Sequence, residues 1–208
     1  MVTMQVARKK SHCKVLGPGL RSVIWFHGCC RKCPGCIADT MNETAVYETI
    51  CPEKLADWVS ENKNIEGITL SGGEPLMQPL DELAKFLTLV KRQSDLSVLC
   101  YTGYTLEELQ EDKEMKNVLL LIDVLIDGEY RQELDKGQRW RGSGNQRFHF
   151  LTPRYRNKAG EWYAANERQI EIELDMNGKL QISGVPSRDF INKLTAELQR
   201  REINVDFS

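Results

Sequence analysis

The chain has 208 residues, a formal net charge of −2 and a hydrophobic fraction of 41%. This length predicts one domain with a sizeable core, and the near-neutral charge gives no reason to expect nucleic acid as a partner. No stretch is apolar for long enough to span a bilayer, and the basic residues 8–10 precede no apolar run of the signal-peptide type. Seven cysteines without a secretory segment indicate a reducing compartment, so we expect a cytoplasmic protein.

Strands and helices are predicted to alternate along the chain. A short apolar run at 22–27 is the first expected strand, and a cysteine-rich loop follows it. Pro52 then opens a helical stretch that runs to about Asn62. Further on, strands are expected at 67–70, at 97–101 and within 118–126, with helices at 80–92 and after the capping residue Thr105. This alternation predicts an α/β fold with a parallel sheet and crossover helices.

Four polar or glycine-rich segments come directly after these strands. They are the cysteine loop, SGGEP (71–75), TGY (102–104) and DGE (127–129). In folds with parallel strands the ligand lies beyond the carboxyl ends of the strands. We therefore expect the four segments to converge on one rim of the sheet.

The cysteine loop, HGCCRKCPGCIAD, carries Cys29, Cys33 and Cys36 in a C-x3-C-x2-C run. Three closely spaced thiolates can hold three irons of a cubane iron–sulfur cluster and leave the fourth iron open to a small molecule. Cys30 makes the register ambiguous, because Cys30, Cys33 and Cys36 are also evenly spaced. Gly28 before Cys29, and the x3-x2 spacing that results, favour Cys29 as the first ligand.

Zinc is the main alternative for these cysteines. Structural zinc requires four ligands, and the fourth would be His27, Cys30 or Cys51, with no second C-x-x-C pair elsewhere in the chain. A disulfide framework is a weaker alternative, because seven is an odd number and a chain of this length needs no covalent cross-links.

The glycine motif offers Ser71, Gly72, Gly73 and Glu74 as ligand contacts. Glycines let a ligand approach the backbone closely, and the Glu74 carboxylate and nearby carbonyls can accept hydrogen bonds from a cationic amino group. The same residue types form plain turns in many proteins. The expected position beside the cysteine loop favours a ligand site.

Two weaker candidates lie on the same rim. Thr102 offers a hydroxyl beside Gly103, although both residues also suit a turn before the helix capped by Thr105. Asp127 can bind ribose hydroxyls or a cation, or it can cap a turn with Gly128. The residue types leave both alternatives open at each position.

The cysteine triad with a downstream GGEP motif resembles the radical S-adenosylmethionine superfamily. Within it, IWFHGCCRKCPGC, GITLSGGEPL, YTGYTLEEL, LIDVLIDGEYRQEL and WRGSGNQR resemble, in order and approximate spacing, the glycyl-radical-enzyme activases that serve anaerobic ribonucleotide reductase. The resemblance covers roughly residues 12–151. The ordered set of segments is far more specific than any one of them.

The resemblance implies a partial (β/α) barrel with a [4Fe–4S] cluster held by Cys29, Cys33 and Cys36. S-adenosylmethionine would chelate the fourth iron, with the motif Ser71–Glu74 at its methionine end and the two weaker candidates on the rim. One electron would cleave the cosubstrate to methionine and a 5′-deoxyadenosyl radical, which would take a hydrogen atom from a glycine of the partner. The implied partners are a glycyl-radical enzyme such as anaerobic ribonucleotide reductase and a flavodoxin or ferredoxin-like electron donor.

Two features depart from the pattern that the resemblance supplies. Gly35 stands where much of the superfamily has an aromatic residue, although activases of this type tolerate glycine there. The chain also continues beyond Leu151, where the short activases end, to Ser208. A radical enzyme that modifies a peptide or a small molecule is therefore one alternative, and a non-catalytic iron–sulfur or zinc module is another.

We expect a radical core at 1–151 and an extension at 152–208 that packs on it. In the extension, 169–174 and 179–183 predict a β-hairpin around the turn pair at 177–178, and a helix is expected from Pro186 onward. Completion of the sheet edge by this hairpin is favoured over a role in selecting a different partner. The segment 140–150 is interpreted as a solvated turn between strands.

Overall fold

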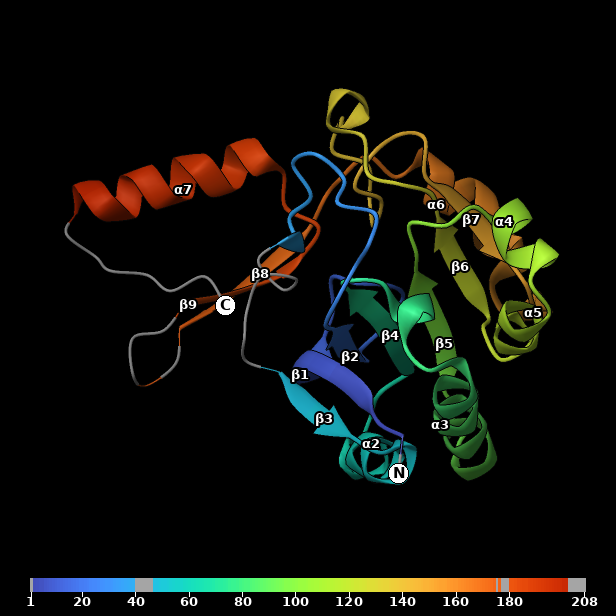
Figure 1. Ribbon diagram of the computed structural model, residues 1–208. Coiled ribbons are helices and arrows are strands. Elements are labelled where there is room, and N and C mark those ends of the chain that lie inside the picture. Colours follow the sequence, from blue (N-terminus) through green and yellow to red (C-terminus); the bar gives the residue numbers. More distant parts are fainter. Residues whose placement is uncertain (1, 40–46, 175, 177–179, 202–208) are drawn as a thin grey trace.

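The computed structural model describes residues 2–39, 47–174, 176 and 180–201. Within them, seven strands form one sheet in the order β3-β1-β2-β4-β5-β6-β7, and β8 pairs with β9 in a separate two-stranded sheet (Figure 1). The strands are β1 (Met4–Cys13), β2 (Arg21–Phe26), β3 (Glu48–Ile50), β4 (Gly67–Gly72), β5 (Ser97–Tyr101), β6 (Val124–Asp127), β7 (Arg147–Phe150), β8 (Ile170–Leu174) and β9 (Leu180–Gly184).

Most of the helices come between the parallel strands along the chain. They are α2 (Pro52–Glu61), α3 (Leu80–Gln93), α4 (Leu106–Glu111), α5 (Lys113–Leu119), α6 (Ala159–Ala164) and α7 (Arg188–Arg200), with 3-10 turns η1 (Pro75–Met77), η2 (Gln132–Leu134) and η3 (Pro153–Lys158). In the described residues, no helix is both long and apolar enough to cross a membrane.

The centre of the main sheet is parallel, and both of its flanks are antiparallel. Strands β2, β4, β5 and β6 run parallel, with α2 before β4, α3 before β5, and α4 and α5 before β6. Strand β1 pairs antiparallel with β2 and, on its other side, with β3, and β7 pairs antiparallel with β6. The expected α/β alternation with a parallel sheet is therefore confirmed for the central strands.

The apolar run at 118–126 divides between a helix and a strand. Asp112 caps α5 by accepting hydrogen bonds from the backbone N–H groups of Glu114 and Met115, and the helix extends to Leu119. Strand β6 begins only at Val124. The apolar residues of this run do not mark the change by their periodicity, because the buried end of α5, Val118 and Leu119, precedes the fully buried β6 by only a few residues.

The sequence patterns did not predict the three flanking strands β1, β3 and β7. Strand β1 carries three consecutive basic residues, 8–10, which mask the alternation of its buried Met4 and Val6. The interpretation of 140–150 as a solvated turn is wrong, because Trp140, Arg141 and Ser143 are buried and the last four residues form β7 with Phe148 buried. At β1 and β7, hydrogen bonding to the neighbouring strand, rather than the local sequence pattern, determines that the segment is a strand.

The two faces of the central strands pack against different groups of side chains. Ile24 and Phe26 of β2 belong to the large core cluster that also contains the buried side chains of α2, α3 and α5. Their neighbours Val23 and Trp25 belong to a second cluster with Cys13 and Leu16. Since successive strand residues point to opposite faces, β2 is apolar on both, as a buried parallel strand must be.

The C-terminal hairpin is not added to the main sheet. Strands β8 and β9 pair only with each other among the described residues, and side chains hold them against β1. The Lys10 ammonium lies 2.8 Å from a carboxylate oxygen of Glu171 and 2.9 Å from one of Glu173. The hairpin therefore does not complete the sheet edge. The expected turn at Asn177-Gly178 lies outside the described residues, and α7 follows Ser187 as expected.

Asp123 joins three elements through one buried carboxylate. It accepts hydrogen bonds from Lys91 Nζ at 2.6 Å, from Val98 N at 2.8 Å and from Thr152 Oγ1 at 2.8 Å. Burial by itself would raise the pKa of Asp123, but the Lys91 ammonium and the two neutral donors outweigh it and lower the pKa. The stabilisation is therefore present above the ordinary carboxyl pKa and is lost as pH falls through the lower folded value.

We predict that Asp123→Ala lowers the free energy of unfolding at pH 7 by about 3 kcal/mol, because it leaves buried donors without an acceptor. Denaturant titration measures the loss, which should shrink at about pH 3, near the ordinary carboxyl pKa. Asp95→Ala is the control, because the Asp95 side chain is 99% exposed in its ion pair with Arg154. Equal losses in both variants would contradict the assignment.

Candidate functional site

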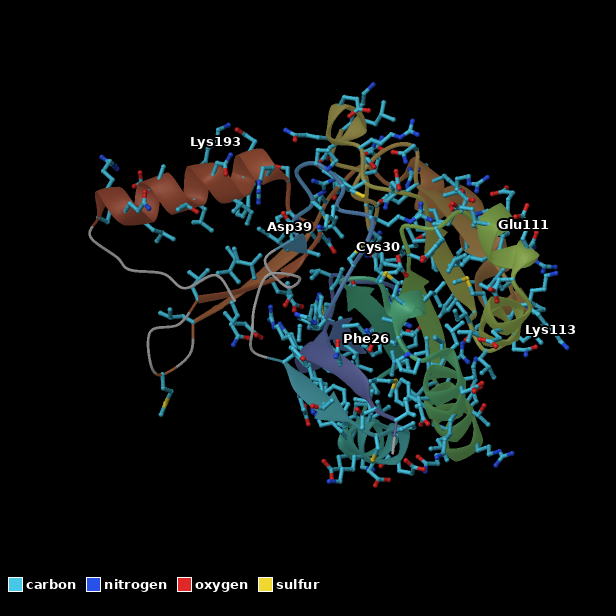
Figure 2. All side chains as sticks on the ribbon, viewed as in Figure 1. Phe26, Cys30, Asp39, Glu111, Lys113 and Lys193 are labelled. Carbon is cyan, nitrogen blue, oxygen red and sulfur yellow. The ribbon has the colours of Figure 1, made fainter. Side chains whose placement is uncertain are left out.

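A pocket opens at the carboxyl ends of the central strands. The four segments that follow β2, β4, β5 and β6 all contribute residues to its lining, so the expected convergence on one rim is present. The cavity measures about 230 Å³, far more than one water molecule needs. Figure 2 shows Cys30 on the cysteine loop, beyond Phe26 at the end of β2. Residues that line the pocket include Cys29, Cys33, Cys36, Ser71, Gly72, Gly73, Glu74, Thr102, Gly103, Gly128 and Tyr130.

The three spaced cysteines share this pocket, whereas Cys30 is exposed and is not part of its lining. Burial raises the pKa of each of the three thiols, to about 11 for Cys36, whose pKa the neighbouring Cys33 and Cys29 also raise. A positive metal centre reverses this tendency, because it stabilises the thiolate. The donor set of Cys29, Cys33 and Cys36 thus fits an iron–sulfur cluster that faces the pocket.

A single metal ion and a cubane cluster require different spacings between the sulfur atoms of three cysteines. One zinc ion needs all of its thiolates about 2.3 Å from the same point. Among the described residues, no three side chains of His, Cys, Asp or Glu are grouped so as to hold one metal ion. In a cubane each thiolate binds its own iron, so the sulfurs stand farther apart.

Contacts that the sequence reading did not identify hold the cysteine loop. Arg31 donates to Glu108 at 3.1 Å and to Glu129 at 3.0 Å, and its guanidinium lies 4.2 Å from the centre of the Tyr104 ring. The loop is thereby attached to α4 and to the segment after β6. Gly35 has a positive φ of +74°, and a Cβ there would stand 2.4 Å from Gln132 Oε1 and 3.6 Å from the Tyr130 ring.

Backbone hydrogen bonds join the glycine motif to the end of β2. The Gly73 N–H donates to the Phe26 carbonyl at 2.8 Å, and the Glu74 N–H donates to the Gly28 carbonyl at 2.7 Å. Gly72 has a φ of +95°, and a Cβ there would meet the Phe26 backbone at 2.6 Å. Glycine is therefore required at position 72 by the approach of β2, besides any ligand in the pocket.

The Glu74 side chain bonds to protein rather than pointing free into the pocket. It is 1% exposed and accepts hydrogen bonds from Leu76 N at 3.0 Å, Thr102 Oγ1 at 2.9 Å and Gly103 N at 2.7 Å. These bonds fasten the loop after β4 to the loop after β5. Burial raises the pKa of Glu74 to about 7, although the three donors act in the opposite direction.

The two weaker candidates have different surroundings. Thr102 lines the pocket and binds Glu74. Asp127 does not line the pocket: its carboxylate lies 2.8 Å from His149 Nε2 and also accepts from Arg147 and from Leu106 N. Burial would raise the pKa of Asp127, but these partners lower it. The structure thus places Asp127 in a network with β7 and α4, while its neighbour Gly128 faces the pocket.

The pocket also contains residues for which the sequence offered no signal. Arg8 and Trp25 line it from β1 and β2, with the guanidinium 4.6 Å from the centre of the indole ring. The segment between β9 and α7 contributes a further wall. Both contributions depend on chain segments far apart in the sequence, so no local motif identifies them.

Comparison with known proteins places the chain in a family. The model of the 4Fe–4S single cluster domain matches residues 15–149, which include the cysteine loop, the glycine motif and Thr102. The chain therefore belongs to the 4Fe–4S single cluster domain family.

Three curated relatives carry the same name. The anaerobic ribonucleoside-triphosphate reductase-activating protein of Enterobacteria phage T4 is 35% identical over 153 residues, which cover 71% of this chain and 91% of that protein. The proteins of the same name from Haemophilus influenzae and Vibrio cholerae are 36% and 37% identical, over 64% and 66% of this chain and 89% and 92% of their own lengths.

We predict that Glu74→Gln changes how stability depends on pH in the cluster-free protein. Because the folded pKa is raised, wild-type stability falls as pH rises from the ordinary carboxyl value, about 4.3, through about 7. Glutamine does not titrate, so the stability difference between wild type and variant should favour wild type more at pH 5 than at pH 8. Denaturant titrations at the two pH values measure it. A difference independent of pH would contradict the raised pKa.

Proposed function

We propose that this chain is a radical S-adenosylmethionine oxidoreductase that generates a glycyl radical on an anaerobic ribonucleotide reductase. The observation that carries the proposal is the shared pocket of Cys29, Cys33 and Cys36 with the backbone of the glycine motif, at the carboxyl ends of parallel strands. The names of the relatives support the choice of partner.

In this proposal Cys29, Cys33 and Cys36 would hold a [4Fe–4S] cluster, and the pocket beside them would bind S-adenosylmethionine. When bound and reduced, the cluster would supply the one electron for cleavage of this cosubstrate to methionine and a 5′-deoxyadenosyl radical, and that radical would take a hydrogen atom from a partner glycine. The chain's own residues bind, orient and shield these reactants.

The surroundings of each pocket residue indicate its role in this reaction. The polar backbone of Ser71–Gly73 faces the pocket beside the cysteines, so we assign it to the methionine end of the cosubstrate. Glu74 positions that backbone through its bonds to Thr102 and Gly103. Trp25, Tyr101 and Tyr130 supply apolar surface that excludes water from a reactive radical. Asp127 is engaged by Arg147 and His149 and acts through the rim rather than by direct contact.

We further propose that the main sheet is curved into a partial (β/α) barrel. Residues of β1, β2, β4 and β5 all line one pocket, together with the loop after β6. Neighbouring strands stand about 4.8 Å apart, so side chains from so many strands reach a common cavity most readily when the sheet wraps around it. The helices α2, α3 and α5 pack on the other face, which is then the outside of the barrel.

The remaining parts of the proposal concern organisation and partners. Residues 1–151 form the radical core, and residues 152–208 form an extension packed against it. A flavodoxin or ferredoxin-like protein donates the electron in the cytoplasm, and neither nucleic acid nor a membrane takes part. The net charge of −2 and the absence of any long apolar run in the sequence motivate the last statement.

We predict that Cys33→Ala loses both the brown colour and the formation of 5′-deoxyadenosine after anaerobic reconstitution with iron and sulfide. Cys30→Ala is the matched control, because Cys30 is exposed beside Cys29 but is not part of the pocket lining. It should keep the cluster absorbance and the product. Loss of both in Cys30→Ala, with retention in Cys29→Ala, would assign the alternative register.

We predict that the wild-type protein with dithionite, S-adenosylmethionine and the anaerobic ribonucleotide reductase of the same organism yields a glycyl-radical signal in electron paramagnetic resonance. The signal should depend on the cosubstrate. Cosubstrate cleavage without radical on the reductase would favour modification of another peptide or a small molecule. A zinc-loaded protein without cleavage would favour the non-catalytic module.

A further inference from the structure

The segment from Ile182 to Ile191 lies in the C-terminal extension and forms a wall of the cluster pocket. It contributes Ile182, Gly184, Val185, Pro186, Arg188 and Ile191 to the same lining that contains the three cysteines. Most of these side chains are apolar. They face the pocket from outside the strands and loops that carry the cysteines and the glycine motif.

The extension reaches this position by crossing from one flank of the sheet to the other. Its first part packs on β7, where Tyr163 Oη accepts from Phe148 N at 2.8 Å. Arg168 then donates to Asp135 at 2.6 Å and to the Gly142 carbonyl at 3.3 Å, both between β6 and β7. Three residues later, Glu171 binds Lys10 of β1. Figure 1 shows β8 and β9 beside β1, across the molecule from α6 and β7. The extension thus spans the open side of the pocket.

One arginine couples the wall to the interior of the pocket. Arg8 donates to the Ile182 carbonyl at 3.0 Å and to Ser183 Oγ at 3.1 Å, and its guanidinium also packs on the Trp25 ring. Val185 packs against the cluster that contains Trp25. These contacts hold the wall against Arg8 of β1 and Trp25 of β2.

The helix that continues the wall extends away from the core. None of the side chains of α7 is fully buried, and the helix stands apart from the main sheet in Figure 1. Ile191, Leu194 and Leu198 share one face at helical spacing. Lys193 points away from the body of the molecule in Figure 2. Only the first turn of α7 reaches the pocket, through Arg188 and Ile191.

The comparisons place this wall outside the shared core. The family match ends at residue 149. The alignments with the phage, Haemophilus and Vibrio proteins cover 89–92% of those relatives but only 64–71% of this chain. The wall is thus added to a core that these relatives retain almost whole.

We propose that the wall formed by Ile182, Val185 and Ile191 contacts the glycine-bearing peptide segment of the partner enzyme and determines which segment enters the pocket. This inference rests on the proposed function. The occupant is an extended peptide segment with apolar residues beside its glycine. The continuity of the wall with the cysteine pocket argues for it, because a glycine delivered to that pocket must pass along these side chains.

The test compares two substitutions on one helix. Ile191→Ser removes an aliphatic side chain that lines the pocket, and Leu198→Ser makes the same change two turns further on, outside the lining. The rate of glycyl-radical formation is measured against the concentration of the anaerobic ribonucleotide reductase of the same organism. Iron content, cluster absorbance and circular dichroism establish that each variant is loaded and folded. Ile191→Ala is the milder second variant.

We expect Ile191→Ser to raise the reductase concentration for half-maximal rate about tenfold, the effect of losing the burial of one aliphatic side chain, with the maximal rate changed less. Leu198→Ser should match wild type. Equal effects of the two serine variants, or none in either, would overturn the role of the wall while leaving the proposed function in place. Failure of the wild-type protein to cleave S-adenosylmethionine without the reductase would instead overturn the proposed function.

Discussion

The buried carboxylate of Glu74 is the interaction on which the candidate site depends. Four strands, β2, β4, β5 and β6, end at the pocket, and hydrogen bonds at Glu74 join the segments after three of them. Glu74 fastens the loop after β4 to Thr102 and Gly103 after β5, while its backbone and that of Gly73 bind the end of β2. The carboxylate thus joins the loops after β4 and β5, and the adjacent backbone N–H groups join both to the end of β2. Its burial, reflected in a pKa raised to about 7, indicates that it acts as an internal brace.

The division of the sheet into two faces explains how a cavity persists beside a close-packed core. The helices cover one face with a continuous apolar cluster. The other face presents larger and more polar groups, such as Arg8, Trp25 and Tyr101, to the pocket. Dense packing on one side supplies the rigidity that a site built from four loops requires. The cysteine loop is further tied to this frame by Arg31, which reaches Glu108 and Glu129 on two neighbouring segments.

The extension lines the pocket without joining the main sheet. Its hairpin turns charged side chains toward β1, where Lys10 and Arg8 bind Glu171 and Ser183, and the strand face that carries Ile172 and Leu174 is left exposed. The strands of the hairpin pair with none of the described strands of the main sheet. The hairpin instead lies over the side of the pocket, which is why a role in receiving the partner accounts for its placement better than a structural role.

The sequence by itself determined the chemistry and much of the frame. The spacing of Cys29, Cys33 and Cys36, the glycine motif, and the strands β2, β4 and β5 are local patterns, because ligand spacing and buried apolar runs are set by neighbouring residues. Only the tertiary structure decided that Asp127 bonds to Arg147 and His149, that β1 and β7 flank the parallel strands, and that Cys29 rather than Cys30 lines the pocket. It also decided that the extension crosses from Asp135 to Lys10. Each of these features depends on contacts between residues that are distant in the sequence. The local sequence pattern therefore does not predict it.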